Sequence, residues 1–184
     1  MLSPVPPTMV SCGQGENANI ITVAWTGILC TKPPVTYISV RPERHSYGLI
    51  EESGEFVINL VPSSLAAVCD TCGVKSGRDV NKFELAGLHK AEAQAVSAPL
   101  IDECPVNIEC RVRDKLSLGS HDVFIADILA VDVDTALIDQ NGKIRMWKAD
   151  LLAYAHGSYY TLGRHLGDFG FSVRKKKKKK RPAR

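Results

Sequence analysis

The sequence lacks a hydrophobic run long enough to cross a membrane. Its longest near-continuous apolar stretch, residues 123–133, is interrupted by Asp127 and Asp132 and is well short of the about 20 residues that a bilayer requires. The N-terminus also lacks a positively charged segment followed by an apolar one, which is the pattern of a secretion signal. We therefore expect a cytoplasmic protein with no membrane association.

A second closely spaced cysteine pair, which a four-ligand zinc site needs, is also missing. Cys69 and Cys72 have the Cys-x-x-Cys spacing of thiol redox sites and zinc knuckles, whereas five residues separate Cys104 from Cys110. We expect no metal, and we predict that most of the six cysteines are reduced and buried. A thiol or zinc module centred on the first pair stays open as an alternative.

The formal net charge of +3 conceals an acidic body. Nine of the 23 Lys and Arg residues lie within residues 174–184, which leaves 14 basic residues against 20 acidic ones in the remainder. Such a body has no positive field to attract nucleic acid or anionic lipid, so we expect no specific recognition of nucleic acid. Residues 172–184 cannot bury apolar area, and their positive charges repel one another, so we predict a disordered basic tail. The preceding residues, 1–171, are predicted to form a single domain.

Short runs of β-branched and apolar residues, separated by Gly, Pro and Asn, are typical of strands joined by turns. The expected strands are residues 20–26, 35–40, 56–60, 106–116, 123–133 and a short stretch near 143–147. Many short strands in a chain of 184 residues indicate a sandwich or a barrel. We predict a mainly β fold with a few short peripheral helices.

Two segments have helical features. Residues 45–53 have apolar side chains at helical spacing, and Gly54 follows where a helix commonly ends on glycine. Residues 63–73 form a second candidate, which Ser63 is able to cap. Residues 73–90 are polar and contain glycine, so we expect mostly loop with one turn of helix.

Residues 13–18 match the permissive glycine pattern of dinucleotide-binding sites. That pattern binds a pyrophosphate only where it opens a helix, because the helix dipole faces the ligand. Here the β-rich run 20–26 follows, so we predict a hairpin loop instead.

Several short motifs occur in a fixed order along most of the chain. They are Asn19–Thr26 (NIITVAWT), Lys32–Pro34 (KPP), Ser39–Ser46 (SVRPERHS), Gly54–Leu60 (GEFVINL), Cys72–Gly73, Ser76–Asp79 (SGRD) with Lys82–Phe83, and Gly119–Asp122 (GSHD). Each motif alone is weak, but their order over residues 7–160 resembles the flavin reductase-like family, and within it the flavoredoxins.

The resemblance implies a split β-barrel homodimer that binds FMN noncovalently at the subunit interface. By position, the residues implied along the flavin are Asn19, Thr22, Trp25 and Thr26. Those implied near the ribityl phosphate are Ser39, Arg41, Arg44 and Ser46, with Lys82 and His121 also at the site and Tyr154 as a further member.

The residue types suit this ligand on chemical grounds. A phosphate with nearly two negative charges is best held by Arg, Lys and hydroxyl groups, which Arg41, Arg44, Ser46 and Lys82 supply. The broad flavin ring needs a flat wall such as Trp25.

The polar edge of the ring needs hydrogen-bond donors, which Asn19 and Thr26 are able to provide. His121 is able to donate to the flavin or phosphate, or to guide a nicotinamide, and is the candidate catalytic residue.

Each of these residues also has a purely structural interpretation. A tryptophan in an apolar strand is usually part of the core, and Arg41 and Arg44 beside a proline are by default a solvated pair. His121 and Lys82 are equally compatible with ordinary surface positions.

Two functions follow from the resemblance. In the first, an oxidoreductase takes electrons from NADH or NADPH through FMN to free flavin or another acceptor. In the second, a flavoredoxin-type carrier exchanges electrons with a redox protein partner and oxidises NAD(P)H poorly.

Overall fold

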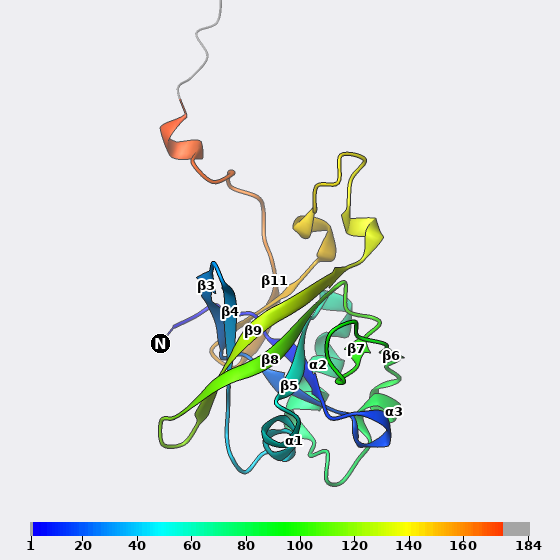
Figure 1. Ribbon diagram of the computed structural model, residues 1–184. Helices are drawn as coiled ribbons and strands as arrows, with labels where there is room; N and C mark the ends of the chain where they lie inside the picture. Colours follow the sequence, from blue (N-terminus) through cyan, green and yellow to red (C-terminus); the bar gives the residue numbers. More distant parts are fainter. Residues whose placement is uncertain (1, 175–184) are drawn as a thin grey trace, which may run out of the picture.

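The computed structural model describes residues 2–174. The predicted disordered tail therefore lies outside the described residues from residue 175 onward. Among the described residues, no helix has the length and apolar character to cross a membrane. Figure 1 shows the strands curling around one body, with short helices beside them.

A seven-stranded antiparallel sheet with the order β2-β1-β5-β8-β9-β4-β3 forms this body. Its strands are β1 (Thr8–Cys12), β2 (Asn19–Val23), β3 (Thr26–Thr31), β4 (Pro34–Val40), β5 (Glu55–Leu60), β8 (Val106–Ser117) and β9 (Asp122–Val133). Two small hairpins pair β6 (Lys90–Ala91) with β7 (Leu100–Ile101) and β10 (Leu152–Ala155) with β11 (Ser158–Thr161). The predicted mainly β fold is confirmed.

Short helices lie between these strands. The α-helices are α1 (His45–Ser53), α2 (Ala66–Val74) and α3 (Lys82–Ala86). The 3-10 turns are η1 (Gly15–Asn17), η2 (Ser63–Leu65), η3 (Thr135–Leu137), η4 (Met146–Ala149) and η5 (Phe171–Val173). The predicted helix at 45–53 is confirmed, and Gly54 ends it at a φ of 66°, a left-handed conformation that glycine adopts without strain.

The sheet closes into a barrel, since side chains from distant strands meet in one core on its inner face. Ile21 of β2 at one edge and Ile38 of β4 near the other belong to the same buried cluster as Phe56 and Phe124. Strands that are far apart in the sheet order share a core only if the sheet curls into a barrel.

Consecutive strands β2 and β3 occupy the two opposite edges of the sheet. The chain crosses between them at Ala24 and Trp25, where the Trp25 carbonyl accepts a hydrogen bond of 2.9 Å from the backbone N–H of Ser39. This crossing, which we call the seam, is where the barrel is split.

A second core covers the outer face of β1 and β2. Met9 and Ile20 pack there with Cys69 and Cys72 of α2 and with Phe83 of α3. All residues of β1 are buried because it has a core on each face.

Two predicted strands are wrong. The run at 20–26 is not one strand, because β2 ends at Val23 and β3 begins at Thr26 on the opposite edge. Residues 143–147 are not a strand either, because only Ile144 makes a bridge, to Ile138, and η4 begins at Met146.

The predicted hairpin loop at 13–18 is confirmed, since it joins β1 to β2. The prediction of one helical turn within 73–90 is also confirmed by α3.

Glu109 of β8 holds the loop before β7 against the sheet. Its carboxylate is fully buried and accepts backbone N–H bonds from Gln94, Ala95 and Val96 at 2.9, 2.6 and 3.1 Å. Buried backbone donors are costly when they lose their acceptor.

We therefore expect Glu109→Ala to lower the free energy of unfolding by about 3 kcal/mol, because it leaves three donors without a partner. Glu109→Gln retains one acceptor oxygen and serves as the matched control, with a smaller loss. Urea unfolding of both variants measures the difference, and equal losses would contradict the role assigned to the carboxylate.

Candidate functional site

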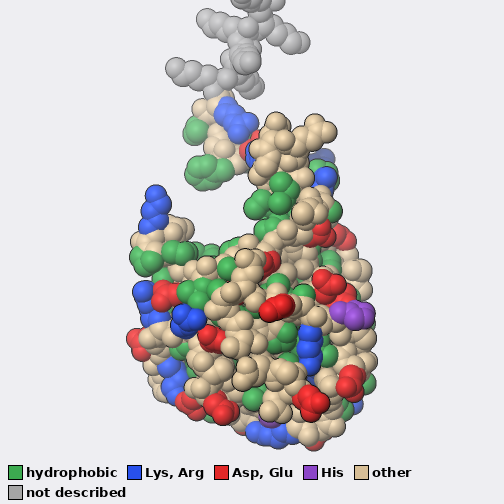
Figure 2. Space-filling view, turned by 45° about the vertical axis from the view of Figure 1, so that its right-hand side comes forward, with side chains coloured by type: hydrophobic (Ala, Val, Ile, Leu, Met, Phe, Trp, Pro, Cys, Tyr) green, Lys and Arg blue, Asp and Glu red, His purple; other side chains and the backbone are tan. Residues whose placement is uncertain are grey.

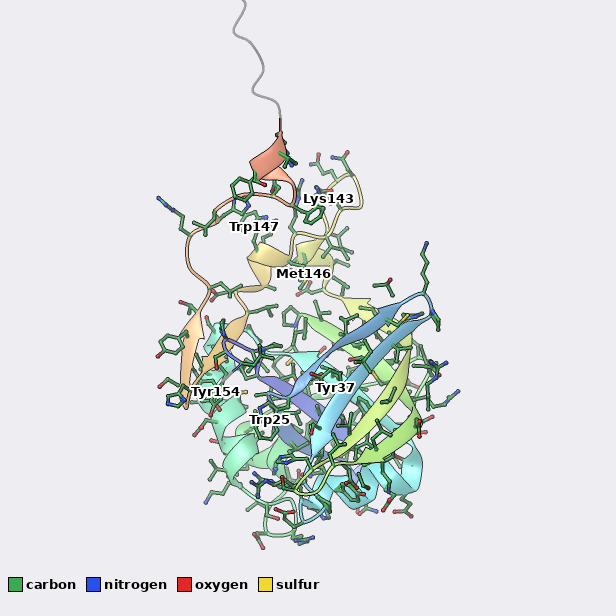
Figure 3. The ribbon with its side chains drawn as sticks, turned by 90° about the vertical axis from the view of Figure 1, so that its left-hand side faces the viewer. Trp25, Tyr37, Lys143, Met146, Trp147 and Tyr154 are labelled. Atoms are coloured by element: carbon green, nitrogen blue, oxygen red, sulfur yellow. The ribbon has the colours of Figure 1, made fainter. Side chains whose placement is uncertain are left out.

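A cleft of about 330 Å³ lies along the seam. Its walls come from β2, the seam, the end of β4, the end of α2, the start of β9 and the β10–β11 hairpin. The lining residues include Thr22, Trp25, Ser39, Arg41, Arg44, Asp70, Gly73, His121, Tyr154 and Tyr159. Figure 3 shows Trp25 and Tyr154 on the same side of the molecule.

Aromatic side chains give this cleft its character. The ring of Trp25 is 4.5 Å from that of His121 with an angle of 61° between them, and Trp25 is still 56% exposed. Tyr154 and Tyr159 stack edge to face at 5.2 Å. Flat apolar surfaces left open to solvent are typical of a binding site for a ring compound.

A second hollow of about 470 Å³ adjoins the first and shares Ile21, Arg41 and Arg44 with it. We call it the cationic pocket. Its polar lining residues are Asn19, Arg41, Glu43, Arg44, His45, Ser46, Lys75, Ser76, Arg78 and Lys82. Five of these are Lys or Arg and one is acidic, so the pocket is positive although the body as a whole is acidic.

Burial and the neighbouring cations both lower pKa values within the cationic pocket. The pKa of His45 is lowered by burial and then by the charges of Arg78 and Lys82. Burial is also the main reason that the pKa of Lys82 is lowered, while Cys72 acts in the opposite direction and Arg44 lowers the pKa further. The contributions of the neighbouring cations, as distinct from burial, are those of a field that favours a bound anion.

Asn19, Ser46 and Gly77 form the floor of the cationic pocket. Asn19 Nδ2 donates to Ser46 Oγ at 2.8 Å, and both side chains are buried. A Cβ at Gly77 would lie 2.4 Å from Asn19 Oδ1, so only glycine allows the loop to approach. Ser46 lies in the first turn of α1, which brings the N-terminus of a helix to the pocket.

Lys82 and Thr22 are held by backbone carbonyls. Lys82 Nζ donates to the carbonyls of Ile20 at 2.7 Å and Cys72 at 2.8 Å, so it ties β2 to α2 at the edge of the cationic pocket. Thr22 Oγ1 donates to the carbonyl of Cys69 from the wall of the cleft.

The structure brings all but one of the predicted site residues to these two hollows. Thr26 is the exception, because its hydroxyl donates to the Tyr37 carbonyl at 2.7 Å within the β3–β4 pair. The β2–β3 break turns it away from the cleft that Thr22 and Trp25 line.

Sequence reasoning assigned no role to several residues that line the site. They are Asp70, Lys75, Ser76, Gly77, Arg78 and Tyr159. The SGRD motif at residues 76–79 was a usable signal, since it combines a hydroxyl, a glycine and a cation in one short loop. No sequence signal pointed to Tyr159, because the β10–β11 hairpin was not predicted.

His121 lies in the cleft with a lowered pKa, which favours the neutral form of its ring. Burial lowers its pKa, and the nearby Arg41 lowers it further, while Glu43 acts in the opposite direction. Its Nδ1 is 2.9 Å from Ser120 Oγ. A neutral imidazole of this kind has one nitrogen able to donate and one able to accept a hydrogen bond.

The two cysteines of the Cys-x-x-Cys pair lie in the second core. Burial raises the pKa of Cys69 to about 12 and also raises that of Cys72. Within residues 2–174 no three His, Cys, Asp or Glu side chains are grouped so as to hold a metal ion. Thiols with raised pKa values are unreactive, so this geometry does not support the thiol or zinc alternative.

The barrel is split at a seam, and the aromatic cleft that lies there leads into a cationic pocket. The flavin reductase-like domain matches residues 1–163, and the chain belongs to that family. An uncharacterized protein of Archaeoglobus fulgidus is 33% identical over 67% of this chain and 70% of its own length.

Solved structures agree with this assignment. The flavoredoxin of Desulfovibrio vulgaris (Miyazaki F) has a TM-score of 0.87 and 28% identity, with 95% of each chain covered. The flavoredoxin of Methanosarcina acetivorans has a TM-score of 0.85 and 27% identity, again with 95% of each chain covered.

We expect Gly77→Ala to lower the free energy of unfolding by about 1–3 kcal/mol, because the new methyl group displaces Asn19 from Ser46. Gly48→Ala is the control, since it has open space on α1 and gains helix propensity of about 0.5–1 kcal/mol. Urea unfolding compares them. A Gly77→Ala protein as stable as the wild type would show that the loop does not hold Asn19 in place.

Proposed function

We propose that this chain binds FMN noncovalently and acts as an FMN-dependent oxidoreductase. The observation that carries the proposal is the continuity of the site, in which an aromatic cleft and a cationic pocket share Arg41 and Arg44. FMN has the same two parts, a broad ring and a phosphate, joined by a ribityl chain.

The cationic pocket fits the phosphate. Arg44 and Arg78 offer charged donors, and Ser46 offers a hydroxyl beside the first turn of α1. Gly77 packs directly against Asn19, which keeps the buried Asn19–Ser46 pair in place in the lining of the pocket. A site with these donors would hold a dianion without a metal ion.

The cleft fits the ring. Trp25 and Tyr154 would shield it from water, while Ser39 and Thr22 line the same cleft. When bound, FMN supplies the electron-accepting chemistry, and the chain binds and orients it. His121, next to Trp25, would use its neutral ring to position a nicotinamide by hydrogen bonding.

Relatives support both proposed activities. An NADPH-flavin oxidoreductase of Streptomyces viridifaciens is 25% identical over 68% of this chain and 65% of its own length, which favours reduction by NADH or NADPH. The structural likeness to two flavoredoxins at 28% and 27% identity favours the second candidate, an electron carrier that serves a redox protein partner.

We extend the proposal to a homodimer with the site at the subunit interface. Trp25 at the cleft is 56% exposed, and Ile28 on the adjoining β3 is 64% exposed. A second copy that covered this edge would complete the enclosure of the ring and bury both side chains.

Flavin titration tests the proposal directly. We expect reconstitution with FMN to give a stoichiometric complex, and Arg78→Gln to weaken it about tenfold or more, since a charged hydrogen bond contributes about 1.5–3 kcal/mol. Arg113→Gln is the control, because Arg113 pairs with Asp127 at 3.1 Å, outside both hollows. Failure of the wild type to bind FMN at high concentration would refute the proposal.

Stopped-flow mixing with NADH or NADPH separates the two activities. Rapid loss of flavin absorbance supports the oxidoreductase, and we expect His121→Asn to slow it about tenfold while FMN affinity holds, because a misplaced reactant loses orientation. Slow bleaching in the wild type would favour the carrier instead.

A further inference from the structure

The chain ends in a projecting segment that is rich in apolar side chains. Residues 162–173, which we call the C-terminal arm, leave β11 and extend away from the barrel (Figure 1). Its large apolar side chains and their exposures are Leu162 64%, Leu166 79%, Phe169 104%, Phe171 58% and Val173 83%. Large apolar side chains at this density are normally buried against something.

The arm has a local shape of its own. The Phe171 N–H donates to the Asp168 carbonyl at 2.9 Å, and Gly170 turns the chain with a φ of 80°. The Phe171 ring lies where a Cβ on Gly167 would meet it at 2.6 Å. Within the described residues, every hydrogen bond and ion pair of the arm joins two positions between 165 and 174. The arm is therefore preformed but is not fastened to its own barrel.

The same chain has an uncovered apolar surface at the open end of the barrel. Ile28 pairs with Thr36, whose side chain lies on the same face as the core residue Ile38, and Val131 pairs with Ile108, which packs on that core. Paired and alternate residues share a face of a sheet. Ile28 and Val131 therefore lie on the inner face of the sheet, at its open end, where no other part of the described chain buries them. Ile28 is 64% exposed and Val131 is 52% exposed.

We call this surface the apolar notch. Its members are Ile28 of β3, Leu129 and Val131 of β9, and Met146 and Trp147 of η4. Figure 2 shows a hollow between the β3–β4 hairpin and the C-terminal arm, with hydrophobic side chains on either side of it. Figure 3 shows Met146 and Trp147 between the sheet and the arm.

We propose that the C-terminal arm of one copy docks in the apolar notch of a second copy, and that the exchange is reciprocal. The inference rests on the homodimer of the proposed function. A two-fold axis buries both arms and both notches at once, so each copy loses two exposed apolar surfaces through one self-complementary contact. The preformed turn lowers the entropy lost when the arm docks.

The exchange would connect assembly to the flavin site. The arm begins at Leu162, directly after the hairpin that carries Tyr154 and Tyr159 into the cleft. An arm held by the other copy would fix the end of β11, and with it the position of these two rings.

Photo-cross-linking of the full-length chain tests where the arm docks. A photoreactive phenylalanine analogue replaces Phe169 in an isotopically heavy copy, which is mixed with light protein and irradiated. We expect heavy-to-light cross-links at Ile28, Val131 or Trp147. Cross-links confined to one copy, or none in these elements, would overturn the proposal.

Sedimentation equilibrium gives the second readout. We expect Phe169→Asp with Phe171→Asp to weaken dimerisation about a hundredfold or more, because each copy loses two large apolar side chains from the contact. Leu85→Asp, at a 52% exposed position on α3, is the matched control and should leave the dimer unchanged. A double variant that dimerises like the wild type would overturn the proposal.

Flavin absorbance recorded on the same samples keeps the two proposals apart. A wild type that binds FMN but cross-links only within one copy disproves the exchange and leaves the proposed function standing. Cross-links between copies in a protein that does not bind FMN would support the exchange and refute the function.

Discussion

The hydrogen bond from the Ser39 N–H to the Trp25 carbonyl marks the constraint on which the rest of the structure depends. It holds the crossing between the two edge strands against β4, so that one sheet encloses one core. Without that crossing, Thr22 and Trp25 from one side and Ser39 and Arg41 from the other would not face each other. The cleft is a product of barrel closure rather than of a dedicated loop.

The second constraint is electrostatic. Five Lys and Arg side chains line one pocket of a body that is acidic as a whole. Some of the side chains that line this pocket also stabilise the fold. Lys82 satisfies two buried carbonyls, and Asn19 satisfies Ser46. A ligand anion would offset the repulsion among these cations, which couples the stability of β2, α1 and α2 to occupancy of the pocket.

Much of the fold could be predicted from the sequence where a single element has its own signal. Helix α1 with Gly54 at its end, β5, and the long β8–β9 pair were predicted from spacing and β-branched content. The break at Ala24 and Trp25 was not, because an apolar run looks the same whether the chain continues or crosses the barrel. Residues that line the two hollows were predicted where they lie within a sequence motif. Tyr159 reaches the cleft only through the tertiary packing of its hairpin, which no local sequence pattern indicates.

The buried sulfurs have a consequence for chemical durability. Burial raises the pKa values of Cys12 and Cys69 to about 12, so both sulfurs remain thiols rather than thiolates at neutral pH. Reduced flavins that meet oxygen release peroxide, which attacks thiolates and hardly attacks thiols. Cys69 lies behind Thr22 of the cleft wall, so as a thiol it would resist oxidation to sulfenic acid when a flavin occupies the cleft.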